Sequence, residues 1–221
     1  MVGLQISKQP TLEYKTRFGE TKTLLLPDSS TVILNANSRL VYNKNWLQSS
    51  REVYLEGEAY FSVVHKQDHQ PFRVKTSNGI SVEVLGTTFN VYHRADTKVV
   101  LNSGQISLRF PVLKNEKVIL MKPGDLVECK KDRYTQRLVN PKNYVSWTDK
   151  KLILNQTTLR EMIQVARHTY GISISVTNEK ILGHTLSGSM PIIDEKSFVM
   201  QLAKAFRLKV EFENQKYLLT Q

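Results

Sequence analysis

The sequence predicts a mainly β protein that ends in a small α+β domain. Three observations carry this prediction: short alternating strands and turns from about residue 21 to 138, a helix-capping pattern after residue 140, and a helix–strand layout that recurs 36 residues later. Of the 221 residues, 40% are hydrophobic and 23% are charged, which is ordinary for a globular chain. We therefore expect two domains, 1–144 and 145–221.

The first region consists of short segments rich in β-branched and aromatic residues. Phe72–Thr76 and Ile80–Val84 each alternate apolar with polar side chains, as half-buried strands do. Asn78-Gly79 between them predicts a hairpin with a type I′ turn, whose central residues both need positive φ. No helical period is present, so we expect an all-β domain, either an antiparallel sandwich or a solenoid-like fold. Further strands are expected at Thr31–Leu34, Arg51–Leu55 and Ala59–Val63, with Glu56 and Glu58 at the edge of a turn around Gly57.

After a linker at Asn140–Asn143 the pattern becomes helical. Thr158 and Glu161 form a capping box, in which each side chain satisfies an unpaired backbone N–H at the helix start. Gly171 supplies the stop, and Ile172–Val176 then alternates as a strand. The apolar face of this helix is formed by Leu159, Met162, Ile163, Ala166 and Tyr170.

The same layout recurs after a shift of 36 residues. Asp194 takes the place of Thr158 as a helix cap, and Leu208–Phe212 takes the place of the first strand. Two tandem βαβ-like units imply a small α+β domain, with two helices packed on one sheet, and two units are too few for a solenoid. The matching apolar pairs are Met162 with Phe198, Ala166 with Leu202, and Tyr170 with Phe206.

No group of residues points to catalysis, a cofactor or a metal. The sequence lacks the Gly-x-Ser-x-Gly motif of a nucleophilic serine and the glycine-rich phosphate-binding motifs. His65 and His69 lie in a polar loop without further ligands nearby, whereas a closed zinc site needs four. Cys129 lies in an apolar strand pattern and is expected to be a small buried hydrophobe. We therefore expect no enzyme and no catalytic, cofactor-binding or metal-binding residue.

The net charge of +11 makes nucleic acid, an anionic membrane surface or an acidic protein a natural partner. The basic residues are scattered, however, and form no block of five or six like charges. Short helices on a small sheet also occur in KH RNA-binding domains, which clamp RNA with a Gly-x-x-Gly loop. Gly183 and Gly188 have the wrong spacing for that loop, so we expect no nucleic-acid partner.

Several segments together resemble the FecR sensor domain. They keep that family's order and spacing over more than a hundred residues. Two turns depart from the family pattern, because Ser29 replaces its usual Asp-Gly-Ser glycine, and the glycine common after Trp147 is replaced within Asp149–Lys151. The C-terminal unit resembles the short domain at the N-termini of secretins and TonB-dependent transducers. The segments that carry the FecR resemblance are Leu24–Ala36, Arg51–Phe61, Pro71–Val74, Val84–Val91, Ser103-Gly104 and Lys122–Gly124.

This resemblance implies a function. FecR-type anti-sigma factors have a cytoplasmic segment that holds an extracytoplasmic-function sigma factor, one inner-membrane helix, and a periplasmic region. This chain would be the periplasmic region, with the other two parts absent from it. A TonB-dependent outer-membrane transducer would present its N-terminal signalling domain to this region, and the sigma factor would then be released or activated. The implied protein is a non-enzymatic regulator anchored to the inner membrane.

The partner is expected to dock mainly on the C-terminal unit. A small open sheet has edges whose unpaired N–H and C=O groups can accept another strand. Lys216–Thr220 is the expected edge, and Tyr217, Leu218 and Leu219 are the candidate partner-binding residues. Alternatively, Tyr217 and Leu219 complete the core. Two other functions stay open from the residues alone: a nucleic-acid-binding βαβ module and a carbohydrate-binding β domain.

Overall fold

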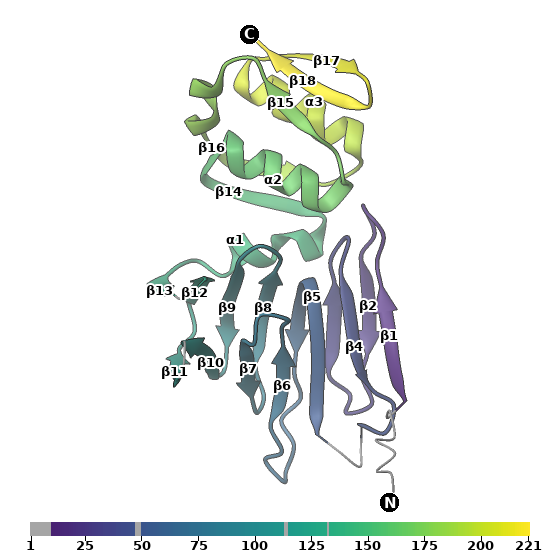
Figure 1. The fold of residues 1–221 in the computed structure, drawn as a ribbon, viewed down its shortest axis with the longest axis vertical. Helices are drawn as coiled ribbons and strands as arrows, with labels where there is room; N and C mark the ends of the chain where they lie inside the picture. The colour runs from purple at the N-terminus through teal and green to yellow at the C-terminus, as the bar shows by residue number, and fades with distance from the viewer. Residues whose placement is uncertain (1–9, 47–49, 113–114, 132) are drawn as a thin grey trace, which may run out of the picture.

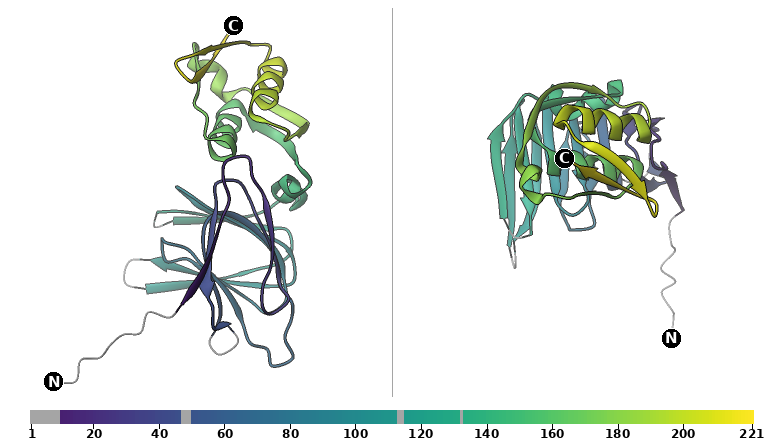
Figure 2. Two further views of the ribbon diagram at one scale, coloured as in Figure 1. Left: turned by 90° about the vertical axis from the view of Figure 1, so that its right-hand side faces the viewer. Right: turned by 90° about the horizontal axis from the view of Figure 1, so that it is seen from above.

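A computed structural model describes residues 10–46, 50–112, 115–131 and 133–221 of the protein. Within these residues the chain is mostly strand, which confirms the mainly β fold with an α+β part. The β part and the α+β part stack end to end and have separate apolar cores (Figures 1 and 2). The short helices α1 (Lys142–Val145) and η2 (Ser146–Asp149) join them, where a linker was expected. The division at residues 144 and 145 stays a prediction.

Thirteen strands of the described chain form one sheet that curls on itself. Its main path runs β11-β10-β7-β6-β5-β8-β9-β12-β13, and the strand pairs β1–β4 and β2–β3 join it at β5 through β4 and β3. Within this sheet, all described pairs are antiparallel except β5–β6. The strands are β1 (Thr11–Lys15), β2 (Lys22–Leu25), β3 (Thr31–Leu34), β4 (Arg39–Asn43), β5 (Arg51–Ser62), β6 (Phe72–Lys75), β7 (Ser81–Val84), β8 (Thr88–His93), β9 (Thr97–Ser103), β10 (Ile106–Val112), β11 (Asn115–Met121), β12 (Asp125–Lys130) and β13 (Arg133–Leu138).

Strand β5 belongs to both layers of this curled sheet. Its first half pairs with β4 and β6, and its second half pairs with β3 and β8. The chain bends between the halves at Gly57, whose φ is 92°. The expected turn at Glu56–Glu58 is therefore wrong, because this glycine lets one continuous strand bend without ending.

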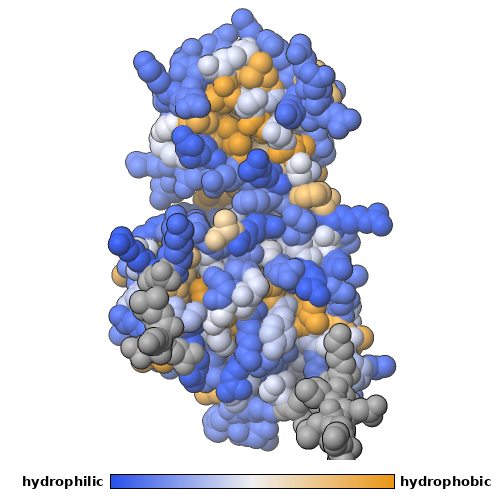
Figure 3. Space-filling view, viewed as in Figure 1, coloured by the Kyte–Doolittle hydropathy of each residue, from blue (hydrophilic) through white to orange (hydrophobic). Residues whose placement is uncertain are grey.

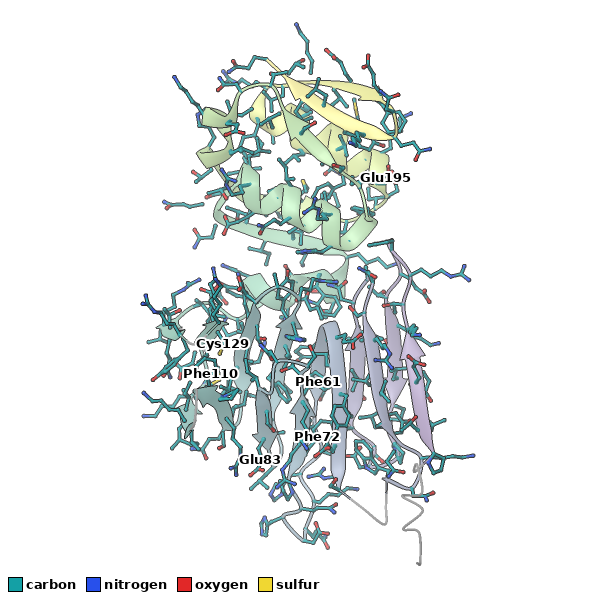
Figure 4. The ribbon with its side chains drawn as sticks, viewed as in Figure 1. Phe61, Phe72, Glu83, Phe110, Cys129 and Glu195 are labelled. Atoms are coloured by element: carbon teal, nitrogen blue, oxygen red, sulfur yellow. The ribbon has the colours of Figure 1, made fainter. Side chains whose placement is uncertain are left out.

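The interior between the two layers is filled by alternate residues of these strands. Phe61 of β5 stacks on Phe89 at a centroid distance of 5.0 Å and meets the edge of Phe72 at 6.1 Å (Figure 4). A fully buried side chain of this size contributes about 1.5–3 kcal/mol. Cys129 is 2% exposed, and burial raises the pKa of its thiol to about 12. The expectation of a small buried hydrophobe at this position is confirmed.

The hairpin predicted at Asn78-Gly79 is present, but its turn type is not the expected one. β6 and β7 pair antiparallel, and Gly79 N–H donates to the carbonyl of Thr76 at 3.0 Å. Of the two central residues only Gly79 has positive φ, at 83°, so the turn is not type I′. Thr76 also pairs with Ile80 through its backbone, which lengthens the loop and removes the need for a second left-handed residue.

The two turns that lack the family's glycine still adopt a left-handed backbone. Ser29 has a φ of 69° and Lys150 has a φ of 55°. Ser29 lies in a closed turn, in which its N–H donates to the Leu26 carbonyl at 2.9 Å. Because a Cβ disfavours this conformation by roughly 1–2 kcal/mol, both residues are strained.

We therefore expect Ser29→Gly to stabilise the β domain. Relief of the left-handed strain exceeds the roughly 0.5–1 kcal/mol of extra chain entropy that a glycine loses on folding, so the net gain is about 0.5–1 kcal/mol. Urea unfolding measures this gain. Ser29→Ala is the control, because it keeps the Cβ and gains nothing. Equal stability of the two variants would contradict the strain argument.

The C-terminal part confirms the two predicted helices and their caps. In α2 (Leu159–Tyr170), Glu161 N–H donates to Oγ1 of Thr158 at 3.2 Å, and Thr158 N–H donates back to the Glu161 carboxylate at 2.8 Å. In α3 (Glu195–Phe206), Asp194 accepts from Ser197 N–H at 2.8 Å. The repeat extends to the C-terminal caps, since Gly171 and Arg207 are both left-handed.

The helices pack with two small sheets, not with one as expected. β14 (Lys151–Thr158) pairs with β16 (Thr185–Pro191), while β15 (Ile174–Val176), β18 (Lys216–Thr220) and β17 (Lys209–Glu213) form the second sheet in that order. Each repeat is thus a β–α–β unit. The strands before the two helices, β14 and β16, pair in one sheet, and the strands after them, β15 and β17, lie on either side of β18 in the other. A single-sheet expectation fails because each unit has a strand before its helix as well as one after it.

Candidate functional site

The two domains meet where the C-terminal end of α2 contacts loops of the β domain. Gly19 N–H, in the loop between β1 and β2, donates to the carbonyl of Thr169 at 2.7 Å. Phe18 covers Gly171 so closely that a Cβ at residue 171 would lie 2.8 Å from its ring. Figure 1 shows this loop reaching α2. We call this set of residues the interdomain contact; its members are Phe18, Gly19, Tyr92, Arg94, His168, Thr169 and Gly171.

A hydrogen bond between side chains crosses the interdomain contact. The Tyr92 hydroxyl lies 2.9 Å from Nδ1 of His168. Arg94 fixes the tyrosine side, because its guanidinium stands 5.8 Å from the Tyr92 ring centre and donates to the carbonyls of Ala36 and Asn37. Burial raises the pKa of Tyr92 to about 12, so this hydroxyl stays protonated.

Glu58 lies behind this hydrogen bond, one residue after the bend in β5. Its carboxylate accepts from Nδ2 of Asn35 at 2.7 Å and from Nδ2 of Asn90 at 2.8 Å. Burial raises the pKa of Glu58. The two amide donors and the nearby Arg94 and Trp147 side chains lower it, but by less. Trp147 comes from η2, so the carboxylate lies where the β domain meets the segment that joins the domains. Sequence reasoning placed Glu58 at a solvated turn and missed this role.

His168 makes the interdomain contact sensitive to pH. Burial, followed by the charges of Arg94 and Arg167, lowers its pKa from 6.5 to about 4. The folded protein therefore binds this proton less readily than the unfolded chain, so the stabilising contribution is complete above about pH 6.5 and is lost as pH falls towards 4. Glu58 contributes to the pH dependence of stability with the opposite sign, because a raised carboxyl pKa favours the folded state at lower pH.

We expect His168→Gln to reduce the loss of stability between pH 6.5 and 4. Glutamine accepts a hydrogen bond from Tyr92 but does not titrate, so the difference between variant and parent isolates the histidine. Urea unfolding at stepped pH measures it. The exposed His184 offers the matched control, His184→Gln, which should leave the pH dependence unchanged. An unchanged slope in His168→Gln would refute the assignment.

The other sequence candidates do not assemble into a site. His65 and His69 are exposed and face each other at 3.2 Å, but among the described residues no group of three or more His, Cys, Asp and Glu could hold a metal ion. Gly188 lies in β16, opposite Leu154, so the stretch from Gly183 is not the loop of a KH domain. None of the helices in the described part of the chain is long and apolar enough to cross a membrane.

A surface hollow of about 470 Å³ lies on the outer face of the β6–β7 hairpin. Three of its charged lining residues are in ion pairs: Lys75 pairs with Glu52 at 2.8 Å, and Arg73 pairs with the neighbouring Glu83 at 2.7 Å. Figure 4 shows Glu83 on this part of the sheet. Neutralised pairs on an open surface do not form a catalytic constellation.

The candidate partner-binding residues lie elsewhere than expected. Tyr217, Leu218 and Leu219 are in β18, which is the central strand of its sheet and not an edge. The edge prediction is wrong because β15 pairs with β18 in parallel on one side while β17 pairs with it on the other. Leu219 is fully buried and Tyr217 packs against the same core, as the alternative interpretation had it.

Comparison with known proteins assigns the β domain. Residues 13–107 match the family model described as FecR protein. Over these residues the chain is similar to FecR proteins. Of the segments that carried the resemblance, those from Leu24 to Gly104 lie within the match, and β1 to β9 form most of it. FecR proteins are regulators and not enzymes, so the expectation of a non-enzymatic chain agrees with the family.

The fold of the chain is shared by two crystal structures of a protein from Parabacteroides distasonis ATCC 8503, provisionally described as an anti-sigma factor. The structure at 2.50 Å resolution has a TM-score of 0.80 and 22% identity, covering 96% of this chain and 99% of that chain. The structure at 1.65 Å has the same TM-score and identity, covering 94% and 98%. No curated protein matches the chain.

Proposed function

We propose that this chain is the periplasmic signalling region of a transmembrane anti-sigma regulator. In this proposal the N-terminal signalling domain of a TonB-dependent outer-membrane transducer docks on the chain. The signal then passes through an inner-membrane helix to a cytoplasmic segment that controls an extracytoplasmic-function sigma factor. The FecR match over residues 13–107 carries the proposal. The shared fold of a protein provisionally described as an anti-sigma factor supports it.

The free edge of β15 is the docking position that the sheet favours. Tyr217 N–H donates to the Ser173 carbonyl, and Thr177 N–H donates to the Leu219 carbonyl, so odd-numbered residues of this segment face β18. In a parallel ladder the intervening residues, Ile174 and Val176, point their N–H and C=O groups the other way. No described strand pairs with that edge. An extended partner segment can therefore add to it.

The surface beside this edge is apolar. Figure 3 shows hydrophobic residues gathered over the middle of the C-terminal domain, where β15 and α2 lie in Figure 1. Ile172 and Val176 are half-buried and lie on the same face as the buried Ile174. Backbone pairing at the edge would supply affinity, and these side chains would supply selectivity.

The test is a calorimetric titration with the N-terminal signalling domain of the proposed TonB-dependent transducer. The parent chain is expected to bind. Val176→Pro removes one outward N–H from the free edge and should weaken binding by roughly 10-fold or more. Val176→Ala keeps that N–H and is the matched control. No binding by the parent chain would overturn the proposed function, and equal binding by the two variants would overturn the position.

A further inference from the structure

We propose that the interdomain contact is a releasable latch, which holds the C-terminal domain in one orientation and opens when a partner strand adds to β15. This inference rests on the proposed function for the identity of the partner. The latch itself is argued from the contacts alone. It assigns a role to Phe18, Tyr92 and His168, none of which lies on the docking edge.

The interdomain contact can open without exposing a core. The described apolar residues form two separate clusters, one in each domain, and no residue belongs to both. Among the described residues, the contact is made by the Gly19–Thr169 backbone hydrogen bond, the Tyr92–His168 hydrogen bond and the Phe18 ring, which stays 52% exposed. Contacts of this polar kind between domains permit relative motion.

The latch and the docking edge are joined by a very short segment of the chain. Gly171 is the left-handed cap of α2 and lies under the Phe18 ring. β15 begins at Ile174, with only residues 172 and 173 between them. A strand that pairs with β15 fixes the path of residues 172–173, so any shift of β15 is transmitted to the residue that Phe18 covers.

The segment that joins the domains can act as the pivot for their relative rotation. The domains are joined through η2, which ends at the left-handed Lys150, and Lys150 N–H closes the turn on the Trp147 carbonyl at 3.0 Å. Trp147 is 6% exposed and lies near the Glu58 carboxylate, so this end of the joint is buried against the β domain. A joint that is anchored on one side and strained at its last residue is suited to rotation about that residue.

The latch is tested by distance measurement in the whole chain. Spin labels on cysteines placed at the exposed Gln67 and Glu211 report the separation of the domains, and the buried Cys129 does not react. The parent is expected to give one narrow distribution. Phe18→Ala with Tyr92→Phe should give a shifted and broader one. Tyr54→Phe with Leu25→Ala, at exposed positions away from the contact, is the matched control and should match the parent.

The second part of the experiment repeats the distance measurement with the partner present. Adding the transducer's signalling domain should move the parent's distribution towards that of the latch variant. The latch variant should also bind that domain on the order of 10-fold more tightly, because it no longer loses binding energy to opening the contact. A variant distribution identical to the parent's overturns the latch, whatever the partner does. Weaker or unchanged binding by a variant with both domains folded, as judged by circular dichroism, overturns the coupling.

Discussion

Replacing Asp28 with alanine is expected to lower the free energy of unfolding of the β domain by about 3–5 kcal/mol. Asp28 and Arg51 form an ion pair of 3.0 Å, with 1% and 2% of their side chains exposed. Asp28 also accepts from the backbone N–H and the hydroxyl of Ser30. Removing the carboxylate leaves a guanidinium in the core with only carbonyl partners, such as that of Val64.

Chemical denaturation of the variant and its parent measures this loss. Glu56→Ala is the matched control, because the Arg39–Glu56 pair, at 3.2 Å, is exposed and should contribute less than about 1 kcal/mol. If the two alanine variants lose similar amounts, then the buried pair is not what ties the Asp28 turn to the start of β5.

Gly57→Ala is expected to be comparably damaging, with a loss of roughly 3–5 kcal/mol from strain and overpacking together. The φ of 92° disfavours any side chain, and a Cβ would lie 2.3 Å from Ser38 Oγ and 2.7 Å from Ser38 Cα. Because the second atom is backbone, no rotamer change of the serine can relieve the contact.

Thermal and urea unfolding of Gly57→Ala give the magnitude. Gly183→Ala is the control, since that glycine has nothing within 4 Å of the added Cβ, and its stability should change by less than about 1 kcal/mol. A mild effect at Gly57 would mean that β5 can straighten and that the bend is not required for the two layers to share it.

Short sequence patterns predicted the structural features that depend on residues close together in the chain. The Thr158–Glu161 capping box, the Asp194 cap and the burial of Cys129 follow from side chains within a few positions of each other. The continuity of β5 was also readable, because Val53 and Phe61 keep the same parity across Gly57. A glycine between two acidic residues was wrongly given more weight than that alternation.

Strand order and the interdomain contact could not be predicted in the same way. Nothing in Lys216–Thr220 distinguishes a central strand from an edge, because its neighbours are set by residues about 40 and 7 positions away. The Tyr92–His168 bond joins residues 76 apart in sequence, and Glu58 is covered by Trp147 from another part of the chain. Such pairings follow from the folded topology and leave no periodic trace in the sequence.

The central position of β18 also bears on the order in which the chain can fold as it is synthesised. The first β–α–β unit has β15 as its last strand, and β15 finds a partner only in residues 217–219. β17 pairs only with the same strand. Until those residues have left the ribosome, both strands present unpaired edges, and α2 and α3 lack one of the two sheets with which they pack. The C-terminal domain therefore closes in a single late step, whereas the strands from β1 to β13 can pair well before it.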